Sequence, residues 1–251
     1  MDWINASGLF IGSLIANLLS ALSGGGAGLL QFPLLLFFGL PFSVALATHK
    51  VASVALGLGA AFTHLKQKSF SLTEALYLII VGSIGVIMGA NMILAIPAHL
   101  AEQSLGVMIL ALGIYSFFKK QLGQQVLPIH RDWQGWLIGS LGLILIGIIN
   151  GSLTAGSGLL VTLFLVRWFG YSYKQAVALT MICVGLFWNG IGGIAIVQAG
   201  AQIYWPWLPI LLAGSFLGGS LGAYLSTRFS NRVIKTCFEI LTLLVGIKLL
   251  I

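Results

Sequence analysis

Residues 9–38 read LFIGSLIANLLSALSGGGAGLLQFPLLLFF, and this stretch decides the fold. Two apolar runs, Leu9–Ser23 and Gly28–Phe38, lie on either side of the triplet Gly24-Gly25-Gly26. A helix rises about 1.5 Å per residue, so each run reaches only roughly 16–22 Å, less than the bilayer core of about 30 Å. The stretch predicts two short helical arms around a glycine turn. The arms form either one broken span or a hairpin that turns back inside the membrane.

The composition of the whole chain places this stretch in a membrane protein. Of its 251 residues, 59% are hydrophobic and 7% are charged, and the mean hydropathy is +1.05. A soluble domain carries about 25% charged residues, so a soluble enzyme and a nucleic-acid-binding domain are ruled out. We interpret the net charge of +7 as basic cytoplasmic loops. We expect a multi-pass protein surrounded by the lipid bilayer, in the cytoplasmic (inner) membrane of a prokaryote.

A second glycine-interrupted stretch and six longer apolar segments follow. Leu137–Asn150 and Leu159–Phe169 flank the run Gly151–Gly158. Segments of about 20 apolar residues cross a bilayer, and Ser71-Leu72-Thr73-Glu74 predicts a capping box at the start of one of them. The six predicted spans are Val44–Leu65, Leu72–Ile96, Glu102–Phe118, Tyr173–Ala199, Trp207–Ser226 and Val233–Ile251.

Loop charges predict the side of the membrane on which each loop lies. The basic loops contain Lys66 and Lys68; Lys119, Lys120 and Arg131; and Arg228, Arg232 and Lys235. Loops 97–101 and 200–206 contain no Lys or Arg. Short basic loops stay in the cytoplasm, so both ends of the stretch 137–169 lie inside and it makes no net crossing. This pattern favours two hairpins over two broken spans, and it predicts that both termini are extracytoplasmic.

The two halves of the chain repeat each other. The separation of matched residues drifts from 127 (Ile11 to Ile138) to 133 (Gly113 to Gly246). We expect a first repeat over 1–120 with a hairpin at 9–38, a cytoplasmic linker over 121–134, and a second repeat over 135–251 with a hairpin at 137–169. The predicted fold class is an all-α polytopic membrane protein with two inverted-topology repeats, each a glycine-interrupted helical hairpin plus three transmembrane helices. Interrupted helices in inverted repeats are typical of transporters; the alternative is that the glycines only permit close helix packing.

The two glycine turns predict a substrate site near the middle of the membrane. A helix start carries free N–H groups and a partial positive charge, which attract anions. Two such starts that meet from opposite sides would form a small, dry anion pocket, with hydroxyl groups as further donors. The expected substrate-binding residues are Ser23, Gly24, Gly25, Gly26, Gly28, Gln31, Thr48, His49, Lys50, Asn150, Ser152, Thr154, Gly156, Ser157, Gly158, Thr180 and Asn189.

Lys50 supplies the positive charge of this set. It lies about two turns into an apolar span, where a charge is costly and usually functional; the alternative is that it extends to the outer interface. His49 is more typical of a hydrogen-bonded interior residue than of a proton carrier. Asn189 either lines the path or bonds across helices. No carboxylate is expected at a span centre, so ion coupling would need His49, Lys50 or an ion held by backbone carbonyl groups.

These residues resemble the sulfite exporter TauE/SafE family of membrane permeases over nearly the whole chain. The resemblance rests on Gly24–Gly28, Pro33-Leu34-Leu35, Gly39-Leu40-Pro41, Ala47-Thr48-His49-Lys50, Gly151–Gly158, Phe169-Gly170-Tyr171-Ser172, Leu179-Thr180 and the closing segment from Gly214. It implies movement of sulfur-containing and related organic anions, such as sulfite or sulfonates, across the cytoplasmic membrane. Met181 and Ile182 stand where the first half has His49 and Lys50, so only one half supplies a cation.

The sequence therefore predicts a permease or exporter for a small anion, working by alternating access, without enzymatic activity, cofactor or metal. An anion channel of the same fold is the first alternative. An intramembrane serine protease is the second, prompted by Gly156-Ser157-Gly158 and a membrane histidine. The spacing is not G-x-S-G and no matched histidine motif follows, which disfavours it. Besides the small anion and the bilayer we expect no nucleic-acid partner, and homo-oligomerisation stays open.

Overall fold

The computed structural model describes residues 3–25, 27–67, 70–93, 97–118, 120 and 123–250. All regular elements in these ranges are helices, which confirms the all-α prediction. The elements are α1 (Trp3–Ser23), the 3₁₀ turn η1 (Ala27–Leu29), α2 (Gln31–Phe37), α3 (Phe42–Gln67), α4 (Leu72–Met92), α5 (Ala98–Phe118), α6 (Trp133–Ser152), α7 (Ser157–Trp168), α8 (Tyr173–Thr180), the π-helix η3 (Met181–Trp188), α9 (Asn189–Gln198), α10 (Leu208–Arg228) and α11 (Asn231–Leu250).

Six helices in the described ranges are long and apolar enough to cross a membrane, so the protein is polytopic, as predicted. They are α1, α3, α4, α6, the continuous helix Tyr173–Gln198 and α10. The predicted spans at 102–118 and 233–251 are occupied by α5 and α11, of 21 and 20 residues. Of the residues in the apolar stretch of each helix, 72% are buried in α3 and 67% in Tyr173–Gln198, whereas 39–44% are buried in the other four helices. These two helices therefore form the centre of the molecule.

The first arms of the two hairpins are longer than predicted. α1 has 21 residues and α6 has 20, so each is long enough to cross a bilayer by itself. The prediction was wrong at their starts because small and polar residues lower the hydropathy there without breaking the helix. The start of α6 is stabilised by Asp132, whose side chain accepts a hydrogen bond from Gly135 N at 3.1 Å. The second arms are short, with 7 residues in α2 and 12 in α7.

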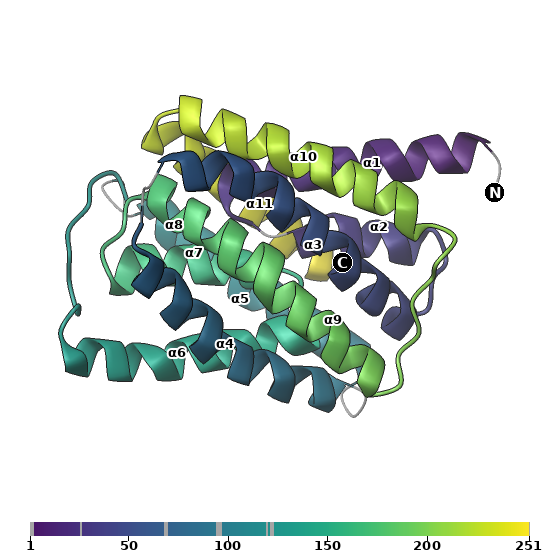
Figure 1. The fold of residues 1–251 in the computed structure, drawn as a ribbon, viewed down its shortest axis with the longest axis horizontal. Coiled ribbons are helices and arrows are strands. Elements are labelled where there is room, and N and C mark those ends of the chain that lie inside the picture. The colour runs from purple at the N-terminus through teal and green to yellow at the C-terminus, as the bar shows by residue number, and fades with distance from the viewer. Residues whose placement is uncertain are drawn as a thin grey trace.

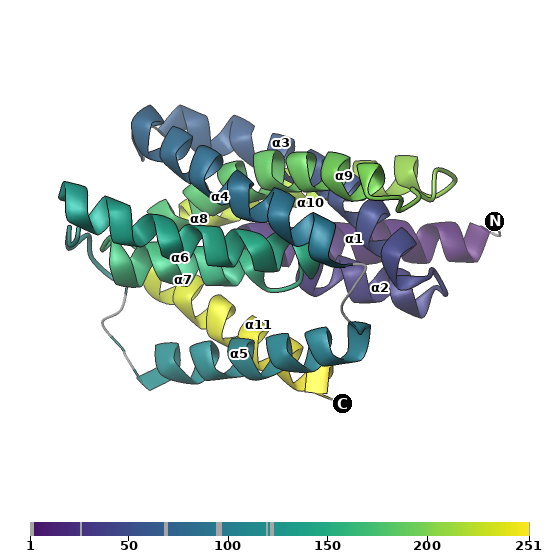
Figure 2. The same cartoon turned by 90° about the horizontal axis from the view of Figure 1, so that it is seen from below.

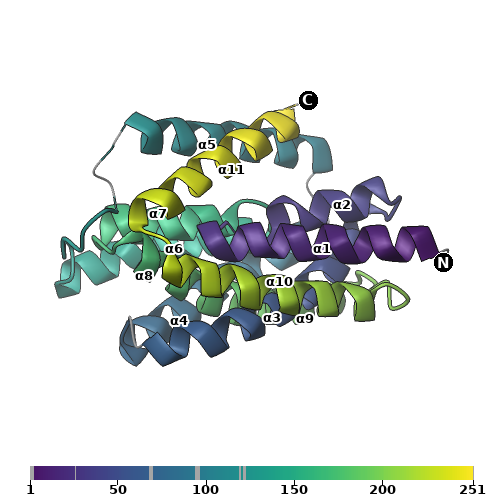
Figure 3. The same ribbon diagram turned by 90° about the horizontal axis from the view of Figure 1, so that it is seen from above.

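Both glycine-interrupted stretches turn back on themselves. Leu34 in α2 packs on α1 so closely that a Cβ atom at Gly12 would lie 2.6 Å from its Cδ2 atom. In the second stretch, Trp168 at the end of α7 donates a hydrogen bond from Nε1 to Gly135 O at the start of α6, at 3.1 Å. Figure 3 shows that each stretch returns to the end of the molecule from which it started. This is the geometry of a hairpin rather than of one broken span.

The two halves of the chain share one core. α1 lies against α10 and α4 lies against α6 (Figure 1), and α5 pairs with α11 (Figure 2). α3 packs on η3 and α9. Every one of these pairs joins an element of the first half to one of the second. The inverted symmetry of the two repeats stays a prediction, but the halves do not form separate units.

The loops predicted to be cytoplasmic gather at one end of the molecule. In Figure 1 the ends of α3, α5, α7 and α10 lie there, together with the starts of α4, α6, α8 and α11. The start of α1 and the connection between α9 and α10 lie at the opposite end. The arrangement separates the basic loops from the uncharged loop 200–206, as the charge pattern requires.

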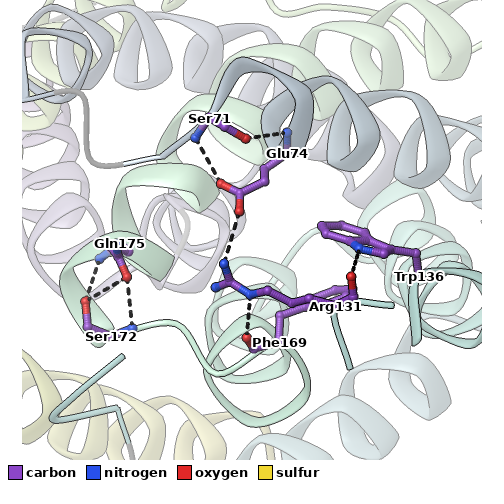
Figure 4. A network of polar contacts seen from close by, with 7 residues as sticks. All are labelled: Ser71, Glu74, Arg131, Trp136, Phe169, Ser172 and Gln175. Carbon is purple, nitrogen blue, oxygen red and sulfur yellow. Dashed lines mark hydrogen bonds and ion pairs between the residues drawn. The ribbon is translucent and has the colours of Figure 1, made fainter. Parts of the chain in front are cut away.

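A polar network stabilises the basic end (Figure 4). Arg131 donates from Nε to Phe169 O at 3.1 Å and pairs through Nη1 with Glu74 Oε1 at 3.4 Å. Glu74 also forms the predicted capping box with Ser71, with hydrogen bonds of 2.9 and 3.1 Å. Trp136 Nε1 donates to Arg131 O at 3.0 Å. The network therefore ties the start of α4 to the start of α6 and the end of α7.

Candidate functional site

Lys50 is fully buried in α3, and its ammonium group reaches the second hairpin rather than an interface. Its Nζ atom donates to the Asn150 carbonyl oxygen at 2.6 Å and lies 3.3 Å from Asn150 Oδ1. Asn150 is the third residue from the end of α6, directly before the second glycine turn. Gly192 in α9 leaves the room that the ammonium group needs, because a Cβ atom there would lie 3.0 Å from Nζ. A cation from the first half is thus held by the second half.

The three carboxylates whose side chains the structure describes are engaged away from Lys50. Glu74 pairs with Arg131, Glu239 pairs with Lys235 as the i,i+4 spacing suggests, and Asp132 caps α6. Among the described side chains, the hydrogen-bond partners of Lys50 are neutral oxygen atoms. A buried charge is costly unless it is paired and hydrogen-bonded. The site therefore has a positive group for which the described protein residues supply no counter-charge.

Four of the predicted residues form one hydrogen-bonded group, which contacts Lys50 through Asn150. Asn150 donates from Nδ2 to Ser157 Oγ at 2.8 Å and to Asn189 Oδ1 at 3.4 Å. Ser157 in turn donates to Thr154 O at 2.7 Å. All four side chains are buried. Asn189 therefore bonds across helices, and the residue that it contacts is the one that holds Lys50.

A second buried network surrounds His49. Its Nδ1 atom lies 2.8 Å from Gln31 Oε1, and Gln31 donates from Nε2 to Ser13 Oγ at 2.7 Å and to Ser215 Oγ at 2.9 Å. Because the amide nitrogen of Gln31 faces two hydroxyl groups, its oxygen faces the ring, and the network assigns the proton to His49 Nδ1. Nε2 then accepts from Ser53 Oγ at 3.1 Å. His49 is thus a hydrogen-bonded interior residue whose partners are Gln31 and Ser53. A serine protease would need a hydrogen bond between His49 and Ser157, and His49 makes none.

Four other predicted residues bond to backbone groups or to Thr162 rather than to the Lys50 group. Ser23 and Ser152 donate to carbonyl groups one turn earlier in their own helices, Leu19 O and Ile148 O, both at 2.8 Å. Thr48 does the same at 2.7 Å and accepts from Tyr204 N at 2.8 Å. Thr180 accepts from Thr162 at 2.9 Å. Among these four, Ser23 and Ser152 bond only within their own helices, whereas Thr48 and Thr180 link different elements.

The two glycine turns meet, but they are packed directly against each other. A Cβ atom at Gly28 would lie 2.9 Å from Thr154 O, in the second turn. Gly24 has a φ of +76°, and a Cβ atom there would lie 2.4 Å from Thr162 Oγ1. Gly25 is buried and donates to Ser20 O at 3.0 Å. An anion between the turns therefore requires that they separate.

The helix starts at the turns differ from each other. α7 begins at Ser157 directly after Gly156, whose φ is +77°, and Gly158 is buried in its first turn. The expected start of a helix right after the first glycine run was wrong. The 3₁₀ turn Ala27–Leu29 intervenes and α2 begins only at Gln31. Gly26 lies outside the described residues.

The sequence analysis missed the residues that complete the buried networks. These are Ser13, Asn17, Ser53, Thr162 and Ser215, all fully buried. Ser13 and Ser215 lie 202 residues apart in the chain, and only the packing of α1 on α10 brings them together. No group of three His, Cys, Asp or Glu side chains in the described part of the chain can hold a metal ion.

Residues 9–249 match the sequence model of a family described as "Sulfite exporter TauE/SafE". The chain is 27% identical over 241 residues to a "Probable membrane transporter protein" of Haemophilus influenzae, covering 96% of this chain and 92% of that protein. It is 24% identical to the "Probable membrane transporter protein YfcA" of Escherichia coli, covering 96% and 88%. It is also 27% identical to the "Probable membrane transporter protein YjnA" of Bacillus subtilis, covering 97% of each chain. No solved structure gives a significant match.

Proposed function

Since the chain belongs to the sulfite exporter TauE/SafE family and is thus a membrane transporter rather than an enzyme, we propose that it carries a small anion bound at Lys50. The observation that carries this proposal is the fully buried ammonium group without a carboxylate partner in the described residues. An anionic substrate supplies the missing counter-charge. A charge is retained inside a membrane protein mainly where it serves function.

A sulfur oxyanion or a small sulfonate or carboxylate suits the donors around Lys50. An ammonium group has three N–H donors, and the two oxygen atoms of Asn150 engage two of them. The third is left for a substrate oxygen. The Asn150 amide and the Ser157 hydroxyl that it bonds belong to the same buried group, and they can orient further oxygen atoms when the turns separate. Charge-assisted hydrogen bonds of this kind are roughly twice as strong as neutral ones.

The way in which the site is divided between the two halves supports alternating access. Lys50 belongs to the first half, whereas Asn150, Ser157 and Asn189 belong to the second. A small rotation of one half against the other separates the packed turns at Gly28 and Thr154 on one side of the membrane at a time. In this proposal the protein lies in the cytoplasmic membrane, its basic loops face the cytoplasm, and both termini are extracytoplasmic. Homo-oligomerisation is compatible with this arrangement.

Anion flux into vesicles tests the proposal. Proteoliposomes that contain the purified protein are incubated with labelled sulfite or a labelled small alkanesulfonate, and initial rates of uptake are compared for the wild type, Lys50→Ala and Lys66→Ala. Lys66 is the matched control because it is an exposed lysine near the end of the same helix. We expect Lys50→Ala to abolish flux and Lys66→Ala to retain it. Transport of cations but of no anion by the wild type contradicts the proposal.

Counterflow distinguishes a carrier from the alternative anion channel. A carrier exchanges labelled external anion for unlabelled internal anion and thereby accumulates the label against the gradient of the labelled anion. Its transport rate saturates as the anion concentration rises. A channel shows single-channel current and no such exchange.

A further inference from the structure

A cavity of about 520 Å³ opens at the basic end of the molecule, away from Lys50. It lies between the end of α5, the segment 123–129 and the end of α7. The lining contains two cations, Lys120 and Arg167, and apolar side chains from all three segments. The apolar residues that matter here are Phe118, Leu127, Ile129 and Val166.

The charged part of this cavity suits a phosphate group. Neither an Asp nor a Glu is among its described lining residues. Arg167 donates from Nε to Tyr115 Oη at 2.9 Å, and this bond orients the guanidinium group. No described residue accepts a hydrogen bond from its terminal N–H groups. A guanidinium group held in this way binds phosphate bidentately, and a lysine adds a flexible point charge. Arg131, which lies 4.2 Å from the ring of Tyr171 at the cavity wall, is engaged with Glu74.

The apolar part of the cavity distinguishes a lipid from a free anion. Phe118 is 75% exposed and Leu127 is 64% exposed. A water-soluble anion makes no use of these side chains, whereas an acyl chain covers them. The cations occur where α5 and α7 end, which is the level of the lipid head groups if these helices lie across the membrane. Basic pockets between membrane helices on the cytoplasmic side are suited to anionic head groups.

We propose that this cavity binds an anionic phospholipid, with the phosphate between Lys120 and Arg167 and an acyl chain along Phe118, Leu127 and Val166. The lipid fills the space between α5 and α7 and connects them. This site is independent of substrate binding at Lys50. Its occupant is a bilayer component, and its recognition elements are one phosphate and one hydrocarbon chain.

Lipid retention by the purified protein tests the site. Full-length protein in detergent is mixed with equal amounts of phosphatidylglycerol and phosphatidylcholine, separated from free lipid, and its bound lipid is quantified by mass spectrometry. We expect preferential retention of phosphatidylglycerol. Removing a cation near the membrane surface weakens anionic lipid binding by about five-fold. Lys120→Gln and Arg167→Gln should each show this loss, whereas Lys66→Gln, at the same end but outside the cavity, should not.

Two further arms separate the lipid from other occupants. Leu127→Ser leaves the cations in place and should also lower retention, because the acyl chain loses its apolar contact. Glycerol phosphate has the head group's charge but no acyl chain. At the concentration at which the lipid binds, it should therefore not displace bound phosphatidylglycerol. Equal retention of both lipids by the wild type, unchanged retention in the two cation variants, or full displacement by glycerol phosphate overturns the proposal. Elution as a single peak in size-exclusion chromatography verifies that each variant is folded.

Discussion

Asn150→Asp places a carboxylate beside Lys50 with almost no change of shape. The new oxygen replaces Nδ2, which in the wild type donates to Ser157 Oγ and Asn189 Oδ1. Oδ1 at position 150 stays 3.3 Å from Nζ and shares the new negative charge. At an effective dielectric constant of about 20, two unit charges at this distance attract by about 5 kcal/mol. Desolvation of the carboxylate costs several kcal/mol, and the hydrogen bond to Ser157 Oγ is altered. We therefore expect the free energy of unfolding to stay within about 2 kcal/mol of the wild type.

The same substitution should abolish anion transport. The internal carboxylate occupies the counter-charge position that the substrate would fill, and it repels an approaching anion. A loss of about 3 kcal/mol in substrate binding corresponds to a more than 100-fold weaker affinity. Asn150→Ala is the matched control. It removes one acceptor of a buried cation, which costs about 1.5–3 kcal/mol of stability, but it leaves the counter-charge position open to an anion.

Thermal unfolding in detergent and initial flux in proteoliposomes measure the two quantities separately. If Lys50 pairs with the substrate, Asn150→Asp keeps its stability and loses flux, whereas Asn150→Ala loses stability and keeps measurable flux. A role for Lys50 in folding alone predicts that flux follows stability in both variants. Wild-type flux and an unchanged KM in Asn150→Asp refute the reasoning.

Three other substitutions probe the surrounding structure. Gly192→Ala places a methyl group 3.0 Å from Lys50 Nζ; the overpacking costs about 1–3 kcal/mol, and flux per folded molecule should fall, whereas unchanged flux contradicts the close approach. Gln31→Leu removes the hydrogen-bond partner of His49 and should lower the free energy of unfolding by about 1–3 kcal/mol, measured by thermal unfolding; an unaltered Tm refutes the network. Burial raises the pKa of the Tyr171 phenol. Above the unfolded pKa of about 10 the phenol ionises in the unfolded chain but not in the folded protein, so the free energy of unfolding falls as the pH rises past this value. Tyr171→Phe should therefore be less sensitive than the wild type to unfolding above about pH 10, and identical pH profiles contradict this.

Local chemistry made much of the fold predictable. Hydropathy runs and charge spacing identified an all-helical membrane protein, because each helix in a bilayer must satisfy its own backbone groups. The capping box at Ser71 and the pairing of Lys235 with Glu239 were predictable for the same reason, since both join residues within one or two turns. The lengths of α1 and α6 were not, because hydropathy falls at Ser7 and Gln134 while the helical hydrogen bonds continue.

The candidate site also has features that the sequence predicts and features that it does not. A lysine within an apolar span and glycines in matched turns are visible in the chain itself, and they indicate a costly charge and a close backbone approach. The partners of that charge are not visible. Asn150 is 100 residues from Lys50, and Ser215 is 184 residues from Gln31. Only the packing of α3 beside the second hairpin, and of α1 on α10, decides these contacts. Hydrogen bonds depend on positions within a few tenths of an ångström, and no local pattern specifies distances between helices so far apart in the chain.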